Sequence, residues 1–206
     1  MRPLAIAHGD PLVEGDQPRT LAEALAHSVE IFPEGRFIFL GPEGKFSYNS
    51  YIATWERSRR VLHGLQLRGV RPGDKLILYF RSCQHFIPAL WASLLGGIIP
   101  VPLVWNEWSR HDERRAPEVF AHLKRVLSAP RIVTDALEEH QEALGLDPKN
   151  TLAINAVEED SPTDSFFESD GERPRLLVLS SGTTAFPNLV ALSGRAVLNR
   201  WWPSMP

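Results

Sequence analysis

The sequence of 206 residues has little of several features that mark particular classes of protein. It contains one cysteine, Cys83, so no disulfide can form within the chain. No Cys/His cluster has the spacing of a zinc site either. Lys and Arg number 22 against 25 Asp and Glu, which gives a net charge of -3. That balance gives no reason to expect nucleic acid or an anionic membrane as a partner.

Long apolar runs are also missing. No stretch approaches the roughly 18 apolar residues of a membrane-spanning helix. The first 20 residues contain prolines and acidic residues and lack the apolar core of a signal peptide. With 43% hydrophobic and 23% charged residues, the composition is that of a soluble globular protein. Together with the lone cysteine, it predicts a cytoplasmic location.

The strongest chemical signal lies between residues 176 and 190. Four apolar residues, 176 to 179, suit a strand buried on both faces. Hydroxyl side chains and one glycine then follow in five consecutive positions: Ser180, Ser181, Gly182, Thr183 and Thr184. Hydroxyl and backbone N–H groups of such a loop can converge on one anion, and glycine allows a close approach. The pattern therefore predicts a phosphate-binding loop.

An ordinary Ser/Thr-rich surface turn is the competing interpretation. The loop is not the P-loop of NTPases, because no second glycine followed by lysine and Ser/Thr is present. A second apolar run, residues 189 to 192, follows the loop directly, so a core strand precedes it and another follows it. This position favours the functional interpretation.

The remaining pattern alternates helices with buried strands. Thr20 and Glu23 form a capping box ahead of a helix, and residues 37–48 read as a hairpin whose Ser47 caps a long helix. An apolar strand is expected at 75–80, a proline-containing edge strand at 98–103, and short strands at 131–134 and 151–155. Asp135 and Glu138 read as another capping box. The order predicts an α/β fold with a layered, largely parallel sheet flanked by helices.

Some residue types invite a functional reading that the sequence does not support. Residues 157–172 contain seven acidic residues and no basic residue before Arg173, which is typical of a flexible linker rather than a metal site. His85 falls in a predicted helix without a matched partner. Cys83 reads as a buried or half-buried filler, and no catalytic residue or metal ligand can be identified.

The loop resembles a family signature. Residues 181–190, Ser-Gly-Thr-Thr-Ala-Phe-Pro-Asn-Leu-Val, resemble the Ser-Gly-Thr-Thr-Gly-x-Pro-Lys-Gly/Leu-Val motif of the adenylate-forming superfamily. This superfamily comprises acyl-CoA synthetases, acyl-AMP ligases and the adenylation domains of nonribosomal peptide synthetases. Residues 71–103, with Val101-Pro102-Leu103 at their end, are also similar to it. The departures are Ala185 for the second glycine and Asn188 for the lysine.

The resemblance implies a site and a reaction. In the family the loop holds the β- and γ-phosphates of ATP, which implies binding roles for Ser180, Ser181, Gly182, Thr183, Thr184 and Asn188. The reaction joins a small carboxylic acid to AMP and then to a thiol, either CoA or a phosphopantetheine carrier protein. It uses ATP and Mg, with the Mg ligand expected outside this chain. Such enzymes are more than twice as long, so the chain alone is expected to be inactive.

The expected organisation is an N-terminal subdomain cut short. Residues 1–19 form a lead-in, 20–156 an α/β subdomain, 157–174 an acidic linker, and 175–206 the phosphate-loop hairpin and the start of a truncated segment. Two hypotheses remain. The chain is part of an acyl- or aminoacyl-activating ligase, or it is a catalytically dead remnant that acts as a binding or docking module. The intact Ser-Ser-Gly-Thr-Thr core favours the ligase.

Overall fold

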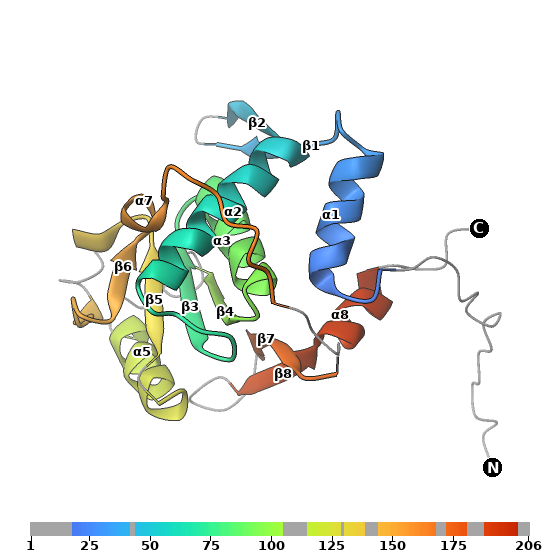
Figure 1. The fold of residues 1–206 in the computed structure, drawn as a ribbon. Coiled ribbons are helices and arrows are strands. Elements are labelled where there is room, and N and C mark those ends of the chain that lie inside the picture. The colour runs from blue at the N-terminus through green and yellow to red at the C-terminus, as the bar shows by residue number, and fades with distance from the viewer. Residues whose placement is uncertain are drawn as a thin grey trace, which may run out of the picture.

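The computed structural model describes residues 18–41, 44–104, 115–128, 130–138, 144–167, 172–180 and 188–201. Its helices are α1 (Leu21–Ile31), α2 (Tyr51–Leu67), α3 (Cys83–Leu95), α5 (Arg115–Val126), α7 (Ile154–Val157) and α8 (Gly194–Trp201). Its strands are β1 (Arg36–Leu40), β2 (Phe46–Ser50), β3 (Lys75–Phe80), β4 (Ile99–Val104), β5 (Arg131–Thr134), β6 (Thr151–Ala153), β7 (Pro174–Leu179) and β8 (Leu189–Ser193). Figure 1 shows their arrangement.

A parallel sheet of four strands forms the centre of the molecule. The strand order is β4-β3-β5-β6, and each neighbouring pair is parallel. Parallel strands need crossover connections, which here include α3 and α5. The sheet and its flanking helices confirm the predicted α/β fold class (Figure 1).

Side chains of β3 are buried on both sides of this sheet. Leu76, Leu78 and Phe80 join a core cluster with residues of α2 and α3. Ile77 and Tyr79 join a second cluster with α5 and with Leu177 of β7. Because successive side chains of a strand point to opposite faces, the two clusters lie on opposite faces of the sheet. The almost continuous apolar run of the sequence at 75–80 reflects this double burial.

The predicted edge strand is confirmed at β4. In the four-stranded sheet β4 pairs with β3 alone, which leaves its other side without a ladder partner in that sheet. Pro100 and Pro102 lie in this strand. Proline lacks a backbone N–H, so it is compatible with an edge where half of the ladder positions are unused.

Proline also occurs inside α3. The helix begins after the cap Ser82, so Pro88 lies beyond the first turn. A proline at this position cannot donate to the carbonyl four residues earlier, which belongs to Gln84. Arg57 of α2 donates to that Gln84 oxygen instead, with a distance of 3.1 Å. The side chain from the neighbouring helix thus replaces the hydrogen bond that proline removes.

Several predicted helix and strand ends are shifted. The hairpin is confirmed, but β2 continues through Ser50, and the hydroxyl of Ser50 rather than Ser47 caps α2 by accepting from the Ala53 N–H. Strand β6 stops at Ala153, because α7 begins at Ile154. Thr20 caps α1 as expected, since its hydroxyl accepts from the Glu23 N–H at 3.1 Å.

The first part of the acidic segment lies along α2, and we call residues 158–167 the strap. Glu158 contacts Arg57 and Arg60 at 3.0 and 3.1 Å, and Glu159 contacts Arg68 at 2.9 Å. Further along the chain, Asp164 pairs with Arg59. The prediction of a flexible linker is therefore wrong for the strap, because basic side chains of α2 compensate its acidic ones. The boundaries of the linker at 157 and 174 stay a prediction.

One sheet surface of the molecule is apolar and exposed to solvent. The hairpin of β1 and β2 exposes a row of large side chains: Ile38, Leu40, Phe46 and Tyr48. Among the helices that the structure describes, none combines the length and the apolar character needed to cross a bilayer.

We predict that Gly64→Ala destabilises the protein although alanine favours helix. A Cβ at this position of α2 would lie 1.6 Å from the carbonyl oxygen of Val157 in α7. The two helices would therefore have to move apart. We expect the free energy of unfolding in urea to fall by about 3 kcal/mol. The control is Leu67→Ala in the same helix, where the side chain is 64% exposed. Equal stability of Gly64→Ala and wild type would show that α2 and α7 do not pack closely.

Candidate functional site

The predicted loop lies at the tip of an antiparallel hairpin. β7 pairs with β8 in a register that ends at Leu179 opposite Leu189. Beyond this pair, the N–H of Ser180 donates to the carbonyl oxygen of Asn188 at 2.9 Å. The two ends of the loop are thus held together by a backbone hydrogen bond.

Only the two ends of the predicted site fall within the described residues. Ser180 and Asn188 lie opposite each other at the base of the loop, and Asn188 is exposed. The predicted positions Ser181, Gly182, Thr183 and Thr184 lie outside the described residues, as does Ala185. The structure therefore brings together the first and last predicted residues and leaves the assignment of the others as a prediction.

The hairpin rests on the rest of the molecule through one face of β7. Arg175 and Leu177 are buried, with 7% and 9% of their surface exposed, whereas Leu176 and Val178 are only partly buried. Leu177 joins the core cluster that contains Val101 of the edge strand β4. The expectation of burial on both faces is wrong for residues 176–179, because β7 forms a two-stranded hairpin with one face against the core.

A second polar group lies at the carboxyl ends of β3 and β5. These strands are neighbours, but β3 leads to β4 on one side and β5 leads to β6 on the other. Side chains at such a divergence are where ligands of open α/β sheets are commonly bound. Asp135, directly after β5, accepts hydrogen bonds from the N–H groups of Arg81 and Ser82 at 3.0 and 2.9 Å. Its carboxylate therefore ties the end of β5 to the start of α3.

His85 lies beside this carboxylate. Its Nδ1 is 3.4 Å from Asp135 Oδ2, a separation that is long for a hydrogen bond, and no aligned partner for this buried atom is found. Burial works to raise the pKa of Asp135, but the contact with His85 and the two backbone N–H groups outweigh it and lower that pKa. The side chain of Asp135 is 6% exposed, and because its pKa is lowered it is a carboxylate at neutral pH.

Comparison with known proteins decides the family. The model of the AMP-binding enzyme family matches residues 25–204, which include the hairpin and the loop. The chain belongs to the AMP-binding enzyme family. Its fold matches the McyG adenylation and carrier-protein structure complexed with phenylalanyl-adenylate, with a TM-score of 0.78 and 27% identity. That match covers 90% of this chain and 34% of the solved one.

Two relatives of this chain are synthetases from Paxillus involutus and Aspergillus ustus. Inactive atromentin synthetase invA6 of Paxillus involutus is 24% identical over 88% of this chain and 19% of its own length. The nonribosomal peptide synthetase ucdA of Aspergillus ustus is 27% identical over 74% of this chain and 17% of its own length. The Klebsiella oxytoca NpsA N-terminal subdomain shares the fold, with a TM-score of 0.71 and 16% identity. The chain thus spans about a fifth of the curated relatives it matches.

Sequence reasoning missed two features of this chain. Asp135 was interpreted as a helix cap and His85 as a histidine without a partner, yet 3.4 Å separates them. The signal that could have indicated Asp135 is an acidic residue directly after a buried parallel strand, at the edge where connections diverge. Cys83, expected to be at least half-buried, is exposed at the start of α3.

We predict that Asp135→Asn lowers the free energy of unfolding by about 1 to 3 kcal/mol at pH 7, because the amide replaces a charged acceptor of two backbone N–H groups. The folded-state pKa of Asp135 is lowered, so its stabilisation is present above the unfolded pKa near 4 and is lost as the pH falls below it. Urea unfolding at pH 7 and at pH 3 measures this. The difference between wild type and variant should shrink at pH 3.

The matched control is Asp160→Asn, which removes the same charge from an exposed position in the strap. It should leave stability within about 0.5 kcal/mol of wild type at both pH values. A gap between wild type and Asp135→Asn that is the same at pH 3 and pH 7 would contradict the lowered pKa.

Proposed function

We propose that the chain is the N-terminal part of an ATP-dependent ligase that activates carboxylic acids as acyl- or aminoacyl-adenylates for thioester formation. Fatty-acid or polyketide and nonribosomal peptide metabolism would use such an activity. The observation that carries the proposal is the family match over residues 25–204, which includes the hydroxyl-rich loop and its closed base. The McyG structure, at 27% identity, carries a phenylalanyl-adenylate and supports the same chemistry.

In this proposal the loop holds the part of ATP that leaves. A carboxylate oxygen of the substrate attacks the α-phosphorus, the bond to the bridging oxygen breaks, and pyrophosphate departs. Hydroxyls of Ser180, Ser181, Thr183 and Thr184 donate to the β- and γ-phosphate oxygens, and the backbone at Gly182 approaches them closely. Donors aimed at developing charge stabilise the departing group. The amide of Asn188 adds a neutral donor where the family motif has a cation.

Other participants act at surfaces beyond these 206 residues. Mg supplies charge neutralisation at the phosphates, and its protein ligand is expected outside this chain. A thiol, of CoA or of a phosphopantetheine carrier protein, would attack the acyl carbon and displace AMP. The small carboxylic acid and the thiol are bound by the remaining two thirds of an adenylation domain. Such chemistry draws on cytoplasmic ATP, and we place the protein in the cytoplasm.

A second candidate is a remnant that binds without catalysing. The observation in its favour is the loss of the family's lysine and second glycine, at Asn188 and Ala185. Relatives include both atromentin synthetases and chains named as inactive ones, so their names do not separate the two candidates. The two candidates are separated by measuring whether a protein with this loop catalyses adenylate formation.

We predict that the polypeptide carrying these residues with the rest of an adenylation domain exchanges pyrophosphate into ATP in the presence of a carboxylic acid. Asn188→Lys should raise the exchange rate about tenfold at low ATP, because a charge-assisted hydrogen bond replaces a neutral one. Thr183→Ala should lower it about tenfold through the loss of a donor to phosphate. Radiolabelled pyrophosphate measures the rates.

The matched control is Asn155→Lys, which adds the same charge at an exposed position of α7. It should leave exchange unchanged. Absence of exchange in both wild type and Asn188→Lys would favour the remnant. Robust exchange that ignores both loop substitutions would show that the phosphates bind elsewhere.

A further inference from the structure

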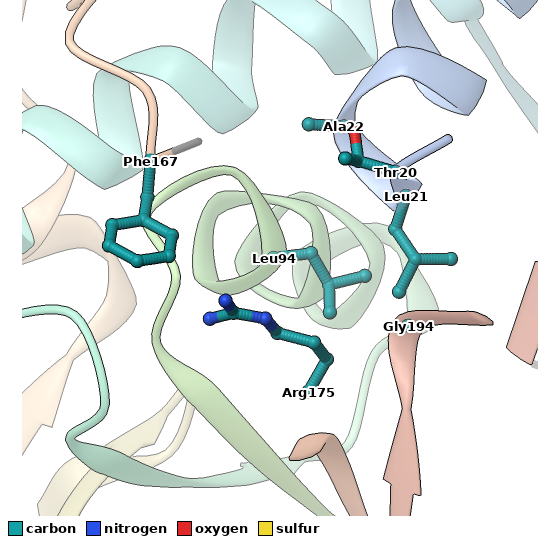
Figure 2. Close-up of a pocket in the computed structure, with 7 residues that line it drawn as sticks. All are labelled: Thr20, Leu21, Ala22, Leu94, Phe167, Arg175 and Gly194. Atoms are coloured by element: carbon teal, nitrogen blue, oxygen red, sulfur yellow. The ribbon is translucent and has the colours of Figure 1, made fainter. Parts of the chain in front are cut away.

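Arg175 lies where several elements of the fold meet. It is the second residue of β7 and is 7% exposed. Figure 2 shows its guanidinium pointing toward Phe167 of the strap, with Leu94 of α3 beside it. The start of α1 and Gly194 at the start of α8 line the same small space.

The contacts of Arg175 join the strap to the turn between α3 and β4. Its Cζ lies 4.7 Å from the centroid of the Phe167 ring, which is within cation–π distance. Its Nη1 donates to the carbonyl oxygen of Gly97 at 3.4 Å. The N–H of Phe167 in turn donates to the Leu95 oxygen at 2.8 Å. These contacts therefore connect β7 both to Phe167 of the strap and to the turn at Gly97.

Gly97 shows how closely these parts approach. Its φ of +66° is a conformation that glycine adopts readily, and a Cβ there would lie 2.5 Å from Cγ of Phe167. The space beside the junction is about 10 Å³, which holds no more than one water. The junction is therefore a packed anchor and has no room for a ligand.

The anchor and the phosphate loop lie at opposite ends of one strand. Ser180 lies five positions after Arg175, which is a distance of about 17 Å along an extended strand. Arg175 and Leu177 are the two buried residues of the strand, although the register with β8 is irregular between Pro174 and Leu176. A small tilt at this anchor would displace the far end of the hairpin, because a two-stranded ribbon is marginal by itself.

We propose that Arg175 is a positioning residue for the phosphate loop: it fixes β7 on Phe167 and Gly97 and so sets where the base of the loop, Ser180 opposite Asn188, lies relative to the parallel sheet. The proposal rests on the phosphate-binding function proposed for the loop. Arg175 acts through β7 and has no contact with the phosphates themselves.

The test uses the 206-residue chain with Arg175→Met, Arg175→Lys and Phe167→Leu. Amide hydrogen exchange reports on residues 174–193, and the dissociation constant for inorganic pyrophosphate reports on the loop. Arg175→Met should speed exchange in the hairpin at least about tenfold, with α2 and β3 unchanged, because local opening is governed by local contacts. It should weaken pyrophosphate binding about tenfold. Arg175→Lys keeps a cation over the ring and should restore most of both properties.

The control is Arg131→Met, because Arg131 also donates to a backbone carbonyl, that of Arg68, away from the hairpin. It should alter neither hairpin exchange nor pyrophosphate affinity. If Arg175→Met fails to fold, Phe167→Leu provides the same comparison with the arginine retained. If neither Arg175→Met nor Phe167→Leu speeds amide hydrogen exchange in the hairpin, the proposal is overturned.

The two readouts separate this proposal from the proposed function. Faster exchange in Arg175→Met with unchanged pyrophosphate affinity overturns the positioning role, although β7 is then still anchored by Arg175. A wild-type chain that does not bind pyrophosphate overturns the function proposed for the loop. In that case the exchange data alone decide the anchoring by Arg175.

Discussion

Burial of β3 on both of its faces is the constraint on which the structure depends. One set of its side chains contacts α2 and α3, and the alternate set contacts α5 and β7. A strand enclosed in this way fixes the layers on either side, because each helix can bury its apolar face only there. The position of the candidate site follows from this arrangement through β4, which lies between β3 and the hairpin.

The hairpin packs against β4 and against the core on the α5 face of the sheet. Leu177 enters the core of the α5 face, and Arg175 is fixed by Phe167 and the turn at Gly97. Ion pairs with α2 hold the strap along that helix, and Phe167 at the end of the strap therefore lies beside Arg175. A segment that is acidic by composition thus links α2 and the end of α3 to β7 through defined contacts. The family match extends over all of these parts.

Sequence patterns predicted the features that depend on neighbouring residues alone, such as helix caps and short strands. Thr20 was identified as a cap, the strand at 131–134 has the predicted bounds, and the edge position of β4 followed from its prolines. Contacts between distant segments could not be predicted in this way. Arg57 donates to the Gln84 carbonyl oxygen, which Pro88 cannot reach with an N–H of its own. Asp135 accepts hydrogen bonds from backbone N–H groups more than 50 positions earlier in the chain. The hairpin was predicted at the correct place, but its one-sided burial depends on β4 and is not visible in residues 176–179.

The central claim is that the loop between Ser180 and Asn188 binds the phosphate tail of ATP. Titration of the 206-residue chain with inorganic pyrophosphate, followed through the amide resonances by NMR, tests it most directly. The N–H of Ser180 closes the base of the loop at 2.9 Å from the Asn188 oxygen and reports on any change there. The account predicts saturable shifts at Ser180, at the loop residues and at Asn188. Shifts confined to other parts of the chain, or none at all at saturating pyrophosphate, would contradict it.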